Sequence, residues 1–95
     1  MSKILYVYDD EGVLASATVS DFETEQEAAV SIIDELIDWT DDQGRNFYND
    51  VDIKTHIKEL ENLKSNVISF AVELNEQAWF ETLLGFTFSC RLNED

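Results

Sequence analysis

The chain contains no proline, only three glycines, a single cysteine and six basic residues. Because no proline- or glycine-rich stretch and no internal repeat marks a linker, we expect residues 1–95 to form a single domain. The lone Cys90 excludes an internal disulfide and is typical of a reducing compartment. No apolar run approaches the roughly 18 residues of a membrane span, and no leader-like segment begins the chain, so we expect a cytoplasmic protein.

Recognisable catalytic motifs are also lacking. No Ser-His-Asp order, CxxC, HExxH or glycine-rich phosphate loop occurs. His56, the only histidine, falls at the edge of an apolar helical stripe, where a structural role is more common than a catalytic one. Cys90 alternates with Phe86 and Phe88 on a face expected to be buried, where a thiol is inert. We therefore expect no catalytic residues, no cofactor and no enzymatic activity.

Acidic residues, by contrast, are abundant and concentrated in one segment. The 21 Asp and Glu give a formal charge of −15, and residues 21–52 alone carry eleven carboxylates against one arginine. Adaptation to high salt would spread acid over the whole surface, yet residues 53–74 are neutral. The local charge therefore favours a defined surface that attracts basic partners or cations and repels nucleic acid and anionic membranes.

Alternating apolar residues predict four strands. Residues 3–9 and 13–20 flank the turn sequence Asp-Asp-Glu-Gly and are typical of a β-hairpin. The same alternation predicts strands over residues 67–74 and 86–92.

Two helices are predicted between these strand pairs. Thr24, followed three residues later by Glu27, predicts a helix start, and the apolar spacing continues to about Thr40. After a polar connection, a second helix is predicted to start after Asn49 or Asp50.

Residues 75–85 leave two interpretations open. Asn75 and Gly85 fit the start and end of a short helix, whereas a hairpin turning at Asn75 and Glu76 fits as well. Under either interpretation we expect an α+β fold: an antiparallel sheet of about four strands, made of the N-terminal hairpin and two C-terminal strands, with two to three helices packed on it.

Helical geometry gathers the acidic residues on one side of the first predicted helix. At about 100° per residue they fall within an arc of about 120°, opposite Leu36. We call this set the acidic face: Glu27, Asp34, Glu35, Asp38, Asp41 and Asp42. Its C-terminal carboxylates lie where the helix dipole disfavours negative charge, and such consistent small penalties indicate a functional surface. From Glu27 to Asp41 the helix rises about 21 Å, and with Asp42 the six carboxylates average about one per 3.5–4 Å, a linear charge density near that of the phosphates of one DNA strand.

In size, charge and this acidic face, the chain resembles the small acidic nucleic-acid-mimic inhibitors of phages and mobile elements. The resemblance covers about a third of the chain and includes no family motif, so it transfers no functional residue. It implies a non-enzymatic inhibitor that mimics DNA or RNA charge, of the anti-restriction, anti-CRISPR or nuclease-inhibitor type, in the host cytoplasm if phage-encoded. The implied partner is a basic nucleic-acid-binding protein, a nuclease or effector complex, with no direct binding to nucleic acid or membrane.

We take the partner-binding surface to be the acidic face and the loop that follows it. The candidate residues are Glu27, Asp34, Glu35, Asp38, Asp41, Asp42, Tyr48, Asp50 and Asp52. An aromatic ring beside this charge would supply the desolvated anchor that affinity needs, since charge mainly steers the encounter. Trp39 is expected in the core, and the burial of Tyr48 stays open.

Other functions stay open for the same surface. It would serve an immunity protein or antitoxin that neutralises a cognate basic toxin, or it could be a solvated face with no partner. Residues 41–52 also offer oxygens that divalent cations prefer, but they do not fit an EF-hand, so a cation-binding domain would be of another type. We assign no metal ligands, and a homodimer stays open because spare strand edges favour it while net charge opposes it.

Overall fold

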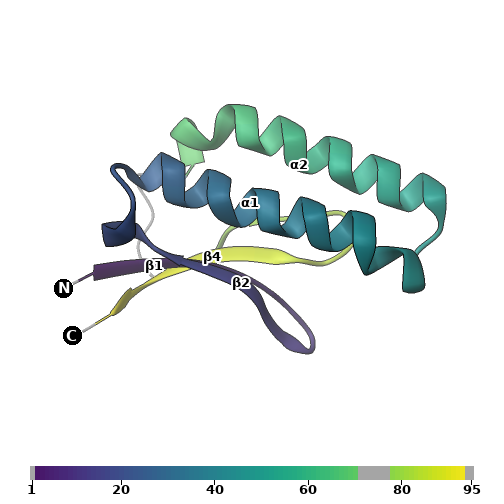
Figure 1. The fold of residues 1–95 in the computed structure, drawn as a ribbon, viewed down its shortest axis with the longest axis horizontal. Helices are drawn as coiled ribbons and strands as arrows, with labels where there is room; N and C mark the ends of the chain where they lie inside the picture. Colours follow the sequence, from purple (N-terminus) through teal and green to yellow (C-terminus); the bar gives the residue numbers. More distant parts are fainter. Residues whose placement is uncertain (1, 71–77, 94–95) are drawn as a thin grey trace.

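Two helices pack on one side of a four-stranded antiparallel sheet (Figure 1). This computed structural model describes residues 2–70 and 78–93. Its elements are β1 (Ser2–Asp9), β2 (Gly12–Thr18), a 3-10 turn (Val19–Asp21), α1 (Glu25–Asp42), a 3-10 turn (Gly44–Asn46), α2 (Asp50–Phe70), β3 (Ala78–Glu81) and β4 (Thr87–Asn93). The predicted α+β class, with an N-terminal hairpin and two C-terminal strands, is confirmed. Neither helix, within the described ranges, is long and apolar enough to cross a bilayer.

The sheet has the order β2-β1-β4-β3, so the first and last hairpins meet at β1 and β4. Leu5 lies opposite Ala17 on one neighbour and Cys90 on the other, and all three are buried beneath the helices. On the opposite face Tyr6 and Tyr8 are half-buried and stack with their ring centroids 5.7 Å apart. The alternation predicted for β1 is therefore a division between a core face and a face without helices.

Capping and apolar spacing explain why α1 forms where it does. The Thr24 side chain accepts a hydrogen bond from the Glu27 N–H at 3.2 Å. Glu27 returns the interaction by accepting from the N–H of Glu23, one residue earlier than in a standard capping box. The buried side chains recur at helical spacing: Ala28, Ala29, Ile32, Ile33, Leu36 and Thr40. The predicted helix is confirmed, and it continues to Asp42.

Removing the Thr24 hydroxyl gives a direct test of this helix start. We expect Thr24→Ala to lower the free energy of unfolding by about 1 kcal/mol, because the Glu27 N–H loses its acceptor. Thr24→Ser keeps the oxygen and should stay within about 0.5 kcal/mol of the original protein. Urea unfolding of the three proteins makes the comparison, and an equal loss in both variants would assign the effect to the methyl group instead.

α2 begins as predicted but extends further than expected. The Asn49 side chain accepts from the Asp52 N–H at 2.8 Å, which caps the helix start at Asp50. The strand predicted over residues 67–74 is wrong for residues 67–70, which continue α2, and residues 71–74 lie outside the described part. Extending an existing helix adds one hydrogen bond for each residue fixed, so a short alternating run does not by itself end it.

The region before the last strand also differs from one prediction. Ala78–Glu81 is a strand paired with β4, so the predicted short helix is wrong for those residues. Asn75 and Glu76, the alternative turn, lie outside the described residues, and the hairpin seen here turns instead over residues 82–86. There the Thr82 N–H donates to the Phe86 carbonyl at 2.8 Å, and Gly85 adopts a φ of 88° that favours glycine. Trp79 and Leu83, like Phe80 and Leu84, lie four residues apart, which is the spacing of a helix. The rings of Trp79 and Phe80 instead pack against Phe88 of the neighbouring strand.

Candidate functional site

The acidic face lies on the side of α1 that points away from the sheet. All six of its carboxylates are exposed, while the opposite side of the helix is buried in the core. From Glu27 to Asp41 the helix rises about 21 Å. One rigid element therefore presents the six carboxylates together, as the helical spacing predicts.

Two of these carboxylates are neutralised by cations from elsewhere in the chain. Lys64 of α2 lies 2.9 Å from Asp34, and Arg45 of the connection lies 2.9 Å from Asp41. The hydrogen bond that the Lys64 ammonium donates to the Asp34 carboxylate, together with the negative charge of that carboxylate, raises the pKa of the Lys64 amine above its ordinary value. Among the described residues the other four make no ion pair, and we call them the unpaired quartet: Glu27, Glu35, Asp38 and Asp42.

A shallow groove runs along the acidic face. Phe22 and Val30 form its apolar part, and both are partly buried against the core. The carboxylates of Glu27, Asp34, Glu35 and Asp38 line the rest, with Gln26 and Ser31. This arrangement suits a long basic side chain, because its aliphatic stem could lie on the apolar strip while its charge reaches a carboxylate.

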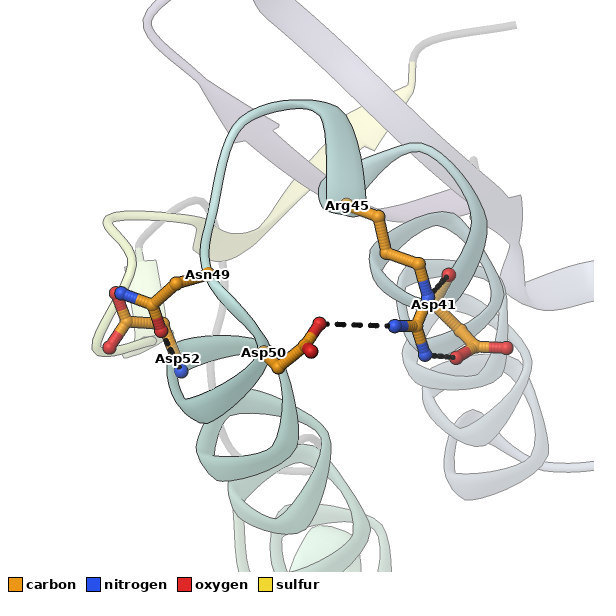
Figure 2. A network of polar contacts seen from close by, with 5 residues as sticks. All are labelled: Asp41, Arg45, Asn49, Asp50 and Asp52. Carbon is orange, nitrogen blue, oxygen red and sulfur yellow. Dashed lines mark hydrogen bonds and ion pairs between the residues drawn. The ribbon is translucent and has the colours of Figure 1, made fainter.

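Arg45 links the end of α1 to the start of α2. Its guanidinium contacts the carboxylates of Asp41 at 2.9 Å and Asp50 at 3.4 Å, and its Nε donates to the Asp41 carbonyl at 2.7 Å (Figure 2). Asp50 and Asp52 occupy the first turn of α2, where the helix dipole favours negative charge. The presence of these two predicted site residues is therefore also explained by the stability that they give to the start of α2.

The same segment was the candidate for a divalent cation. Within residues 2–70 and 78–93, no group of three or more His, Cys, Asp or Glu side chains is placed to hold a metal ion. Asp41 and Asp50 instead share the guanidinium of Arg45, which supplies the positive charge that a cation would bring (Figure 2).

Tyr48 lies apart from the acidic face, in the wall of a pocket of about 590 Å³. Trp39 and Phe47 line the same pocket and stack with their rings 9° from parallel. Trp39 also packs edge-on against buried Phe86, so it belongs to the core as expected and to the pocket as well. Tyr48 itself is half-buried.

Four carboxylates that the sequence did not indicate as a site also line this pocket. Asp9 ends β1, Asp10 and Glu11 form the turn to β2, and Glu81 ends β3. In the sequence the three consecutive acids are typical of a turn, and the Asp9 carboxylate does accept from the Glu11 N–H at 2.8 Å. Their run of charge was the available signal, but only the fold brings them to the aromatic residues.

His56, expected at the edge of the apolar stripe of its helix, is fully buried. Its Nδ1 lies 3.2 Å from the Thr40 hydroxyl, and its ring packs 5.4 Å from that of Phe86. The Nε2 atom has no hydrogen-bond partner among the described residues. Burial lowers the pKa of the ring to about 4, so the imidazole is neutral at pH 7.

The pKa of His56 predicts how stability changes with pH. Below the ordinary value of 6.5 the unfolded chain binds a proton that the folded protein takes up only near pH 4. Unfolding therefore becomes more favourable as pH falls from 6.5 toward 4, and above 6.5 the ring contributes no pH dependence. Between pH 7.5 and pH 5.5 we expect the contribution of His56 to the free energy of unfolding to fall by about 1 kcal/mol. Urea unfolding of the original protein and of His56→Gln at both pH values measures it. Because the carboxylates are common to both proteins, equal pH slopes would contradict the assignment.

Comparisons with known proteins do not assign the chain to a family. No protein-family model matches the chain, and no curated protein and no solved structure matches it either. What the protein does is therefore inferred from the acidic face, the pocket and the fold that carries them.

Proposed function

We propose that the protein is a non-enzymatic inhibitor that binds a basic nucleic-acid-binding enzyme through its acidic face, in the place of a phosphate backbone. One observation carries the proposal: a single exposed helix face presents six carboxylates, and four of them make no ion pair among the described residues. Such an inhibitor would act where its enzyme acts, in the cytoplasm.

The charge spacing is what would make the acidic face resemble nucleic acid to an enzyme. On average α1 carries about one carboxylate per 3.5–4 Å between Glu27 and Asp42, which compares with a phosphate about every 3.4 Å along one DNA strand. A cleft lined with Lys and Arg to hold phosphates would meet a similar field here. Opposite charge of this kind accelerates encounter and excludes acidic partners.

The fold supports this role by holding the charges in place before binding. The side of α1 behind the acidic face is buried against the sheet, and α2 packs beside it (Figure 1). Because the helix is already ordered, little conformational entropy is lost when a partner binds. The strip formed by Phe22 and Val30 would add apolar contact to the charge.

The test is inhibition of purified nucleases by the full chain. A restriction endonuclease, a CRISPR effector nuclease and a repair nuclease are each titrated with the protein while cleavage of a labelled duplex is followed. We expect stoichiometric inhibition of at least one class, weakened more than about tenfold between 50 and 200 mM salt, as for ligands that replace several phosphates. Absence of inhibition in every class, or inhibition unaffected by salt, would contradict the proposal.

A further inference from the structure

The pocket beside Tyr48 has a chemistry that the acidic face lacks. It lies where three connections meet: the β1–β2 turn, the α1–α2 connection and the β3–β4 turn. Figure 1 shows the first two at the same end of the molecule, away from the two termini. The lining residues are Asp9, Asp10, Glu11, Trp39, Phe47, Tyr48, Glu81, Leu84, Gly85 and Thr87.

Its charge is entirely negative. Four of the lining side chains are carboxylates and none is basic. The nearest cation in the sequence, Arg45, contacts Asp41 and Asp50, which are not among the lining residues. No ion pair that the structure shows within residues 2–70 and 78–93 neutralises the four carboxylates.

Its aromatic wall is a second and independent feature. Trp39 and Phe47 stack with their ring centroids 6.3 Å apart, and Tyr48 adds a third ring. Phe47 is 69% exposed, although an apolar ring of this size is stabilised by burial. An exposed aromatic surface beside carboxylates is the combination that recognises an organic cation, since the ring face attracts positive charge and the carboxylates accept its N–H groups.

We propose that this pocket binds an arginine side chain of the partner protein. A guanidinium is planar, stacks on aromatic faces and offers five donors to carboxylates, whereas the ammonium of lysine is a compact and strongly hydrated charge. A metal ion fits less well, because the aromatic wall offers it no ligands and the described residues place no metal-binding cluster there.

The pocket would give the proposed inhibitor an anchor at the end of its acidic face. Trp39 connects the two, because it lines the pocket and lies on α1 next to Asp38. Charge along α1 would steer a basic partner, and one arginine buried in the pocket would hold it. The inference rests on the proposed function for the partner being a basic protein, but arginine binding can be measured on this chain alone.

The experiment is a titration of the full ¹⁵N-labelled chain with a capped Gly-Arg-Gly peptide, followed by amide and indole N–H shifts. Its matched probe is the same peptide with citrulline, which has nearly the same shape without the charge. We expect saturable shifts at the Trp39 indole and the Gly85 amide, and binding of the citrulline peptide at least about tenfold weaker.

Substitutions of pocket residues should weaken binding of the arginine peptide, whereas a substitution outside the pocket should not. Phe47→Ala is expected to weaken it about fivefold through loss of the stacking surface. Asp10→Asn combined with Glu81→Gln should weaken it about tenfold, and both side chains are exposed, so the fold should persist. Glu61→Gln removes an exposed carboxylate that belongs neither to the pocket nor to the acidic face, so it is the matched control and should leave the titration unchanged.

The arginine pocket can be disproved without disproving the proposed function. Equal binding of the citrulline peptide, shifts that map to the acidic face, or no saturable shift would each overturn the arginine pocket. None of these would affect inhibition through the acidic face. Conversely, arginine binding that persists while acidic-face variants inhibit normally would support the pocket and contradict the proposed function.

Discussion

The triple variant Glu35→Gln, Asp38→Asn and Asp42→Asn is expected to bind the target enzyme about a hundredfold more weakly than the original protein. The three carboxylates belong to the unpaired quartet and are exposed on α1, so no ion pair among the described residues has to break before a basic side chain reaches them. A charge contact of this kind contributes about 1 kcal/mol, and three give about 3 kcal/mol, a factor above a hundred. The inhibition constant for duplex cleavage measures the effect.

A matched control separates this surface from total charge. Asp21→Asn, Glu23→Gln and Glu61→Gln also remove three exposed carboxylates, but none of them belongs to the acidic face or the pocket. We expect this control to weaken inhibition less than about tenfold, because only the screened long-range field changes.

Folding of the triple variant should be unaffected or slightly favoured. Asp38 and Asp42 repel each other at i,i+4, and Asp42 lies at the negative end of the helix dipole. Their neutralisation is expected to raise the free energy of unfolding by a few tenths of a kcal/mol.

Equal inhibition constants for the triple variant and its control would assign the effect to net charge and contradict the role of the acidic face.

Phe88→Ala is expected to lower the free energy of unfolding by about 4 kcal/mol, the largest effect of any single change considered for this fold. Phe88 is fully buried in β4, opposite Val7 of β1. Its ring lies 5.2 Å from that of Trp79 and 6.4 Å from that of Phe80. Alanine would leave a cavity that the neighbouring rings fill only in part. The midpoint temperature of thermal unfolding should therefore fall by about 20 °C.

Phe47→Ala makes the same chemical deletion at an exposed position. Phe47 is 69% exposed and, among the residues that the structure describes, its ring stacks on Trp39 alone, so we expect a loss below about 1 kcal/mol. Urea and thermal unfolding of both variants give the comparison. Similar losses in the two proteins would mean that Phe88 is not at the centre of the core.

Local signals in the sequence were sufficient for most of the fold. The alternation of Leu5 and Val7 with Tyr6 and Tyr8 marks the two sides of β1, and Thr24 marks the start of α1. The wrong predictions fall where a short apolar run fits both a helix and a strand. Residues 67–70 continue a helix already formed, and Trp79 is held in a strand by its contact with Phe88. Neither outcome is encoded within the run itself.

The candidate site shows the same division between local and distant information. Helical spacing places Glu27 and Asp38 on one exposed face, because both lie on a single element. It gives no indication that Lys64, 30 residues away, pairs with Asp34. The pocket requires three separate connections to meet, so Asp10 and Glu81 could not be assigned to one site from the sequence. Periodicity reports on one element, whereas pairing between elements follows from the tertiary fold.

The central claim is that the acidic face occupies the nucleic-acid site of its enzyme, and competition by DNA tests it most directly. The inhibition constant is measured for the inhibited nuclease at increasing concentrations of a non-cleavable duplex, at fixed salt. We predict that the protein concentration needed for half-inhibition rises in proportion to the duplex concentration once the duplex saturates the enzyme. A half-inhibiting concentration that does not change with duplex would show that the protein binds elsewhere and would contradict the account.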